Sequence, residues 1–273
     1  MEQLLYDKMK QNITYEAKHI GFRYEKSQVL SDVSFRIQKG ERVAILGANG
    51  SGKSTLLKIF DALLYPSHGE LYFEDSLLNE KYFENEEREF AFRRKVGFVF
   101  QDPDVQLFNQ TVWDEVLFGP LHLGLPESEV VDRANWAMDT LAISRLRDRS
   151  PFTLSGGEKK RVALASILSI KPSVWLFDEP FAGLDPRSQS NLLDFMINTH
   201  NRGETIIVST HDIMLLNELA DRVLVISEDH ELVADTTPEK LLKQKDFMIQ
   251  HNLMHTHMHT HGKKVHSHEH IHK

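Results

Sequence analysis

Residues 41–64 read ERVAILGANGSGKSTLLKIFDALL, and this stretch decides the fold. Its apolar start is typical of a buried strand, its glycine-rich centre of a tight turn, and the apolar spacing of its end of an amphipathic helix. A strand that passes through such a turn directly into a helix is one half of a βαβ unit. The stretch therefore predicts an α/β fold.

The flanking sequence extends this pattern in both directions. Before it, HIGFRY and VLSDVSFRI are separated by polar turns and indicate strands. After residue 150, helix patterns alternate with the strand patterns SVWLF, TIIVST and RVLVIS, which implies a parallel sheet. Between these parts, helical spacing dominates residues 111–149 and predicts an inserted helical lobe over about 103–165. Thr237-Pro238-Glu239 predicts the start of a last short helix.

Composition excludes several classes of protein. The chain has 273 residues, of which 41% are hydrophobic and 26% charged, as in ordinary globular proteins. It has no cysteine, which excludes disulfides, thiolate zinc sites and cysteine nucleophiles. The formal net charge of -8 argues against a nucleic-acid partner. No stretch approaches the roughly 18 apolar residues of a membrane span, and the first residues lack the order of a signal peptide, so we expect a cytoplasmic protein.

Residues 47–54, GANGSGKS, fit a phosphate-binding loop. The glycines allow backbone N–H groups to converge on the β- and γ-phosphates of a nucleotide at the start of a helix. Lys53 would add a positive charge, and the hydroxyl of Ser54 would bind Mg²⁺. The alternative is a plain glycine-rich turn, but the strand before the motif and the helix after it favour the phosphate loop.

Residues 174–179, VWLFDE, are an apolar run that ends in two carboxylates. Asp178 and Glu179 then lie at the carboxyl end of a buried strand, where open α/β sheets bind ligands. Asp178 would hold Mg²⁺ through water, and Glu179 would polarise a water molecule for attack on the γ-phosphate. Such a strand end is by itself commonly a solvated turn or a helix cap, and the phosphate loop upstream favours the catalytic interpretation.

Residues 154–158, LSGGE, have two interpretations. Ser155 and Glu158 have the spacing of a capping box for the helix that follows. Gly156 and Gly157 at this helix start would also leave N–H groups for a second phosphate contact.

These motifs, with Gln101 after an apolar strand, AGLD at residues 182–185 and His211 after TIIVST, resemble in their order the nucleotide-binding domain of ABC ATPases. The resemblance covers about residues 15–245. It implies a P-loop NTPase fold with a mostly parallel sheet core, a β subdomain and the helical lobe. It also implies a head-to-tail dimer, with a second copy or a paralogous ATPase, in which each ATP lies between one chain's phosphate loop and the other chain's LSGGE.

The resemblance assigns roles to single residues. Tyr24 would stack on adenine, although Phe22 lies on the same strand face and a strand tyrosine also serves cross-strand packing. Gln101 would sense the γ-phosphate, and Asp185 would cross the dimer interface. The catalytic groups would be Glu179, Lys53 and His211, of which His211 would contact the γ-phosphate. Thr55 would contact the α-phosphate. The expected ATP and Mg²⁺ site comprises Tyr24, Gly47, Asn49, Gly50, Ser51, Gly52, Lys53, Ser54, Thr55, Gln101, Ser155, Gly156, Gly157, Asp178 and Asp185, with Ser54, Gln101 and Asp178 near Mg²⁺.

A finer resemblance lies in residues 100–120, FQDPDVQLFNQTVWDEVLFGP, which look like the corresponding stretch of energy-coupling-factor importers. It implies a transmembrane coupling subunit and a substrate-capture membrane subunit as partners, a peripheral position at the cytoplasmic face of the membrane, and vitamins, cobalt or nickel as cargo.

The end of the chain, residues 251–273, differs in composition from the rest. It holds nine of the 15 histidines, mostly two residues apart. Imidazoles at this spacing share a face of an extended chain and suit Ni²⁺, Co²⁺, Zn²⁺ or Cu²⁺. The alternatives are a polar tail with incidental histidines or an added tag, and we expect the tail to be disordered. The candidate ligands are His255, His257, His259, His261, His266, His268, His270 and His272.

The sequence thus predicts an ATP-hydrolysing subunit of an energy-coupling-factor importer, with cobalt or nickel as cargo because of the tail. Three alternatives stay open: the ATPase of a vitamin importer, a soluble ABC ATPase without a membrane partner, and a metal buffer in which hydrolysis is dispensable. Intact Lys53, Asp178 and Glu179 argue against the last.

Overall fold

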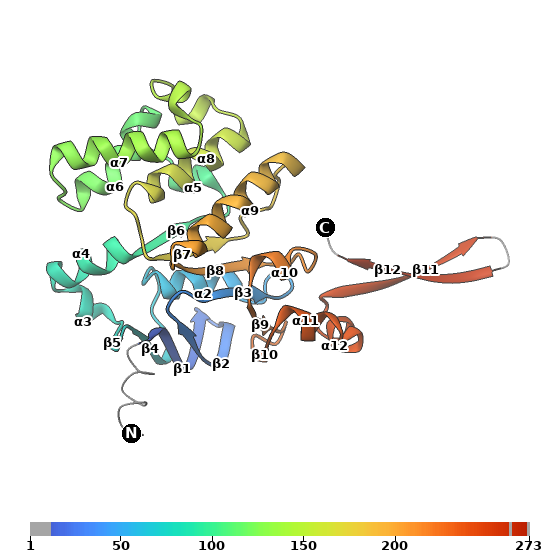
Figure 1. The fold of residues 1–273 in the computed structure, drawn as a ribbon. Helices are drawn as coiled ribbons and strands as arrows, with labels where there is room; N and C mark the ends of the chain where they lie inside the picture. The colour runs from blue at the N-terminus through green and yellow to red at the C-terminus, as the bar shows by residue number, and fades with distance from the viewer. Residues whose placement is uncertain (1–11, 262–263, 272–273) are drawn as a thin grey trace. The chain divides into compact units, whose positions relative to one another are not determined.

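The computed structural model describes residues 12–261 and 264–271 (Figure 1). The chain divides into two compact units. The first consists of residues 1–79 and 205–273, and the second of residues 80–204.

The first unit contains an antiparallel sheet of four strands in the order β2-β1-β4-β5. Its strands are β1 (Ile13–Tyr24), β2 (Ser27–Gln38), β4 (His68–Phe73) and β5 (Ser76–Leu77). Tyr15 on β1 is fully buried, stacks on the ring of Phe60 at 4.8 Å and donates its hydroxyl to the carbonyl oxygen of Phe60 at 3.0 Å. Because Phe60 ends the helix after the phosphate loop, this contact joins the antiparallel sheet to that helix.

The same unit also holds some of the strands that the sequence predicts to be parallel. β3 (Arg42–Leu46) pairs in parallel with both β8 (Thr205–Thr210) and β9 (Arg222–Ile226), and β10 (Leu232–Thr236) runs antiparallel to β9. Most of their side chains are buried, as expected of strands covered on both faces. The accompanying helices are α2 (Lys53–Phe60), α10 (Leu216–Leu219), α11 (Pro238–Leu242) and α12 (Lys245–Gln250). α11 begins at Pro238 with Thr237 as its cap, which confirms the predicted helix start.

The second unit combines two parallel strands with helices. The strands are β6 (Val96–Val99) and β7 (Val174–Asp178). The helices are α3 (Glu80–Phe83), α4 (Glu86–Lys95), α5 (Pro103–Gln106), α6 (Val112–His122), α7 (Glu127–Thr140), α8 (Gly156–Leu168) and α9 (Pro186–Asn201), with short 3₁₀ turns at Ser144–Leu146 and Pro151–Thr153. α6 packs against both α7 and α8 and forms with them the helical lobe. No helix among the described residues is both long and apolar enough to span a membrane.

The structure describes two strands in the histidine-rich tail, and the expected disorder of the tail stays a prediction. β11 (Met254–His261) and β12 (Lys264–Ile271) pair antiparallel as a hairpin, which extends from the end of α12 (Figure 1). The physical reason is the alternation of residue types, because a period of two over eight residues is the pattern of a strand. The metal role of the tail histidines stays a prediction, and of the candidate ligands His272 lies outside the described residues.

Candidate nucleotide-binding and hydrolysis site

The phosphate loop connects the end of β3 to the start of α2. Gly50 and Gly52 have φ angles of 85° and 110°, in the left-handed region that favours glycine. A Cβ on Gly52 would lie 2.3 Å from the carbonyl oxygen of Val29, and one on Gly47 would lie 2.5 Å from that of Ile226. Neighbouring backbone therefore leaves no room for a side chain at either position, so the loop geometry requires glycine.

Lys53 and Ser51 give this loop its polar groups. The buried Lys53 ammonium donates hydrogen bonds to the carbonyl oxygens of Gly47 at 2.9 Å and Ala48 at 3.1 Å, and so curls back over the loop. The Ser51 hydroxyl is buried and has no hydrogen-bond partner among the described residues. A charged lysine and an unused hydroxyl beside glycine N–H groups fit the phosphates of a nucleotide.

Ser54 and Thr55 follow on the first turn of α2, with Ser54 half-buried and Thr55 buried, while Asn49 is exposed on the loop. A serine hydroxyl is one of the oxygen donors that Mg²⁺ accepts, so Ser54 fits the predicted metal role. That role stays a prediction for Ser54, as does the phosphate contact for Thr55.

His211 shares a sheet edge with the phosphate loop. β3 and β8 pair in parallel so that Leu46 lies opposite Thr210. The next residues, Gly47 and His211, therefore leave the sheet at the same edge. This register supports the predicted contact of His211 with phosphate.

Tyr24 and Phe22 are distinguished by burial. Phe22 is only 7% exposed, whereas Tyr24 is 45% exposed, and their rings meet edge to face at 4.8 Å. The buried Phe22 ring therefore packs against the exposed Tyr24 ring. Of the two, Tyr24 is the one available to stack on a base.

His230 is a residue that the sequence analysis missed. It lies in the turn between β9 and β10, and its Nδ1 is 3.1 Å from the carbonyl oxygen of Ser51 in the phosphate loop. Its own carbonyl oxygen accepts a hydrogen bond from the Ser31 N–H at 2.8 Å. A histidine in a short turn carries no motif, so only the folded chain reveals this contact.

In the second unit, β7 ends at the two predicted carboxylates. Asp178 and Glu179 are both buried, and Glu179 has a φ angle of 42°. A residue other than glycine is strained in this left-handed region, and such strain is concentrated at functional sites. The carbonyl oxygen of Glu179 accepts a hydrogen bond from the Ala182 N–H at 3.2 Å, which closes a tight turn directly after the strand.

Lys160 on α8 stabilises this turn through two hydrogen bonds. The sequence analysis did not predict this role. The Lys160 ammonium donates to the carbonyl oxygens of Pro180 at 3.0 Å and Ala182 at 2.6 Å. Burial lowers the pKa of Lys160 from its usual value. Through Lys160, the helix that begins with LSGGE therefore fixes the backbone that follows Glu179.

The start of α8 confirms the capping interpretation. The Ser155 hydroxyl accepts from the Glu158 N–H at 3.4 Å, and the Glu158 carboxylate accepts from the Ser155 N–H at 3.1 Å. The Ser155 N–H and the Ser155 hydroxyl both donate to the Glu158 carboxylate and, with nearby Arg145, hold the pKa of Glu158 below its usual range. The second role of Ser155, Gly156 and Gly157, contact with the phosphate of a second chain, stays a prediction.

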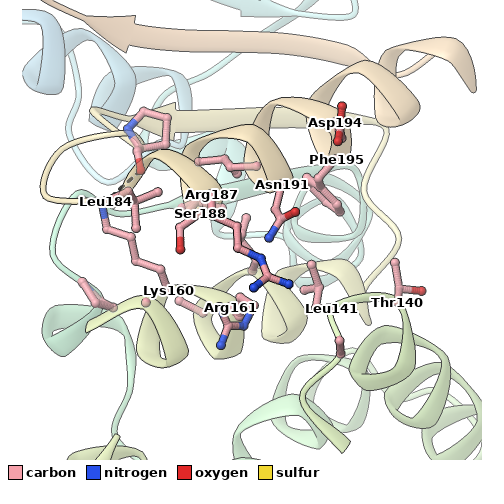
Figure 2. Close-up of a pocket in the computed structure, with 18 of the residues that line it drawn as sticks. Thr140, Leu141, Lys160, Arg161, Leu184, Arg187, Ser188, Asn191, Asp194 and Phe195 are labelled. Atoms are coloured by element: carbon pink, nitrogen blue, oxygen red, sulfur yellow. Dashed lines mark hydrogen bonds between the residues drawn. The ribbon is translucent and has the colours of Figure 1, made fainter. Parts of the chain in front are cut away.

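A groove of about 690 Å³ runs between α8 and α9 (Figure 2). Gly157 and Asp185 both line it, so the structure brings the LSGGE and AGLD motifs together. Asp185 caps α9 by accepting from the N–H groups of Arg187 at 3.0 Å and Ser188 at 3.1 Å, and the Ser188 hydroxyl lowers the pKa of Asp185. The predicted role of Asp185 across a dimer interface therefore comes in addition to a capping role within the chain.

Gln101 is exposed in the loop after β6. Gln106, missed by the sequence analysis, anchors this loop to α8. Its side-chain oxygen accepts from the Phe100 N–H at 3.3 Å, and its amide donates to the carbonyl oxygen of Ala163 at 2.8 Å. The loop that carries Gln101 is thereby fixed at both ends while Gln101 itself faces solvent.

The residues of the predicted ATP site belong to both units. The first contains Tyr24, the phosphate loop from Gly47 to Thr55, and His211. The second contains Gln101, LSGGE, Asp178, Glu179 and Asp185.

Known proteins share this organisation. Residues 30–182 match the family described as ABC transporter. A putative ABC transporter ATP-binding protein of Methanosarcina acetivorans is 46% identical over 94% of this chain and 98% of its own length. The nickel import ATP-binding protein NikO of Rhodobacter capsulatus is 42% identical (84% of this chain, 91% of NikO), and the energy-coupling factor transporter ATP-binding protein EcfA of Methanothermobacter thermautotrophicus is 36% identical (87% and 75%).

Solved structures of ABC ATPases are similar to this chain in fold and in sequence. CbiO1 of Clostridium perfringens, described as part of the ABC transporter complex CbiONQ, is 34% identical with a TM-score of 0.74 over 89% of this chain and 95% of CbiO1. The cassette MJ0796, in a dimeric post-hydrolysis state bound to ADP and Pi, is 26% identical with a TM-score of 0.72 (82% and 98%). These similarities, together with the phosphate loop and the buried carboxylates, define the class of P-loop ATPases. The chain belongs to the ABC transporter ATP-binding family, whose members hydrolyse ATP.

Proposed function

We propose that this ATPase energises an importer of the energy-coupling-factor type that carries nickel or cobalt. The observation that carries the proposal is a complete set of hydrolysis groups in a chain related to EcfA, NikO and CbiO1. Vitamin import is the alternative for the same architecture, because the ATPase itself need not touch the cargo.

Hydrolysis follows from the chemistry of the site residues. The loop N–H groups and Lys53 bind the phosphates of ATP, and His211 contacts the γ-phosphate. Ser54, Gln101 and Asp178 would hold Mg²⁺, which neutralises phosphate charge when bound. Glu179 accepts a proton as water attacks the γ-phosphorus and the bond to the bridging oxygen of ADP breaks, yielding ADP and phosphate.

The active form is a dimer with composite sites. LSGGE at the start of α8 offers N–H groups to the phosphates bound by another chain's loop. The similar cassette MJ0796 is dimeric in a post-hydrolysis state bound to ADP and Pi, which supports a dimer for this chain. Because this chain carries both halves of the site, a homodimer would have two working sites, and a paralogous ATPase would serve equally as the second chain.

The membrane partner would contact the segment around α5 and α6. Four large apolar side chains are exposed there: Val105, Phe108, Phe118 and Leu121. The rings of Phe108 and Phe118 meet edge to face at 4.8 Å, which makes them one cluster rather than scattered residues. Exposed apolar clusters mark protein interfaces, and we assign this one to a transmembrane coupling subunit that acts together with a substrate-capture membrane subunit. The ATPase would then be peripheral at the cytoplasmic face of the membrane.

Copurification in mild detergent tests this assignment. We expect the tagged parent to retain its membrane subunits and the Phe108→Asp/Phe118→Asp variant to lose them, while ATP binding is unchanged. Arg88→Asp, on the exposed face of α4, provides a control for an added surface charge. Recovery of no membrane protein with the parent would contradict the proposal and favour a soluble ATPase.

A further inference from the structure

A buried carboxylate fixes the loop that carries Phe108 between α5 and α6. Glu115 on α6 is only 2% exposed. Its Oε2 atom accepts hydrogen bonds from the Phe108 N–H at 3.0 Å and from the Asn109 N–H at 2.8 Å. Burial of a carboxylate costs free energy unless its oxygens are hydrogen-bonded, and hydrogen bonds to a charged acceptor are stronger than neutral ones. The carboxylate therefore holds the loop backbone at the point where Phe108 leaves it.

The chain is also anchored just before Phe108. Leu107 is 3% exposed, and its N–H donates to the carbonyl oxygen of Pro103 at 2.9 Å at the end of α5. At the far end of the loop, Thr111 caps α6. The backbone at Phe108 thus has an anchor on both sides, a buried apolar side chain on one and the Glu115 carboxylate on the other.

The Phe108 side chain contributes little to the core of the protein. It is 58% exposed and meets the ring of Phe118, which is 39% exposed, edge to face at 4.8 Å. Phe118 stacks in turn on the imidazole of His122 at 4.9 Å. Aromatic side chains carry much of the binding energy at interfaces, and a side chain that is ordered before binding loses less entropy when the partner binds. A fixed backbone that carries an exposed ring meets this requirement.

We infer that Glu115 is a positioning residue for the membrane partner. Through its two hydrogen bonds to the loop, it holds Phe108 in the conformation that the transmembrane coupling subunit binds. The carboxylate itself is buried, so it acts on the partner only through the loop. The inference rests on the proposed function, which assigns the exposed pair of Phe108 and Phe118 to that subunit.

A double-mutant cycle with full-length ATPases tests the inference. Glu115→Leu keeps a side chain of similar size but accepts no hydrogen bond, and Phe108→Ala removes the exposed ring. The membrane subunits that copurify with the parent are reconstituted in lipid nanodiscs, and the dissociation constant of each ATPase is measured. We expect each single variant to bind at least about tenfold more weakly than the parent. The double variant should bind within about twofold of Phe108→Ala, because both changes act on the same contact.

Controls separate positioning from a general loss of structure. Glu115→Gln keeps an acceptor oxygen and should bind within about threefold of the parent. Glu129→Leu removes a carboxylate on α7 that pairs with Arg133 in the same lobe, and it should bind like the parent. ATP affinity and a thermal melt show that each variant is folded. If Glu115→Leu does not fold, Glu115→Asp, whose carboxylate is one methylene shorter, takes its place in the cycle.

Binding by the folded Glu115 variant of the cycle within about twofold of the parent would overturn the inference. Additive losses in the double variant would overturn it as well, because Glu115 would then not act through Phe108. Both outcomes leave the proposed function intact. Absence of binding between the parent and any membrane subunit would overturn the proposed function, and the inference with it.

Discussion

Glu179 combines a buried carboxylate with a left-handed backbone conformation. The turn after it is fixed by its own carbonyl oxygen and by the ammonium of Lys160. A residue held in this way in a strained position has its direction set by the surrounding fold rather than by its own preference. This is the property required of a group that positions a water molecule.

Glu179→Gln tests this role. ATP binding should be retained because the phosphate loop is intact, while kcat should fall by about 10²–10⁴-fold because the amide cannot accept the proton from water. Equilibrium nucleotide binding and steady-state phosphate release measure the two effects. Turnover within a few-fold of the parent would show that Glu179 is not the base.

Lys160→Met tests the positioning of the same turn. The variant loses two hydrogen bonds from a charged donor, so we expect a destabilisation of about 1.5–3 kcal/mol in urea unfolding. We also expect a lower kcat with little change in ATP affinity, because the turn after Glu179 loosens while the phosphate loop is untouched. Lys160→Arg should restore part of kcat. A stability loss without any change in kcat would limit Lys160 to a structural role.

His230→Ala tests the contact beneath the phosphate loop. Loss of the hydrogen bond to the Ser51 carbonyl oxygen should weaken ATP binding several-fold, since one net hydrogen bond contributes about 0.5–1.5 kcal/mol. His230→Asn, which keeps a donor, should retain more affinity than alanine. Nucleotide titrations that show no difference among the three proteins would contradict this role.

At the scale of elements, the sequence predicted the helices, strands and caps that are determined by residues close together along the chain. The strand, turn and helix of residues 41–64, the capping box at Ser155 and the helix start at Pro238 were all predicted, because propensity and local hydrogen bonding determine them. Lys160, His230 and Gln106 were missed, because their partners lie 20, 179 and 57 residues away, respectively. The expected disorder of the tail stays a prediction, although the structure pairs the two strands of the tail as a hairpin.

The LSGGE motif at the start of α8 should complete the ATP site of another chain. Ser155→Arg should abolish hydrolysis, since a bulky cation would occupy the position of the N–H groups offered to the neighbour's ATP. A mixed dimer of Ser155→Arg and Lys53→Ala chains should regain one intact composite site and about half the parent activity, if the two sites fire independently. Each homodimer alone serves as the control. No recovery in a verified mixed dimer would contradict the trans arrangement.

At the scale of the molecule, the histidine-rich tail can be removed without loss of core side chains only if the cut lies after Met254. Leu253 and Met254 are buried, so a cut after Gln250 would remove part of the core. Removal of residues 255–273 should leave thermal stability and ATPase activity unchanged and abolish Ni²⁺ binding by the histidine-rich tail. Calorimetry and a thermal melt measure both properties. Undiminished stoichiometry of Ni²⁺ binding after truncation would place the metal elsewhere in the protein.

Uptake of radioactive Ni²⁺ or Co²⁺ into proteoliposomes that contain the copurified membrane subunits tests whether ATP hydrolysis by this chain energises metal import. We expect ATP-dependent accumulation with the parent ATPase and none with Glu179→Gln, although both assemble with the membrane subunits. Equal metal accumulation with the parent and with Glu179→Gln would contradict it, because transport would then not depend on hydrolysis by this chain.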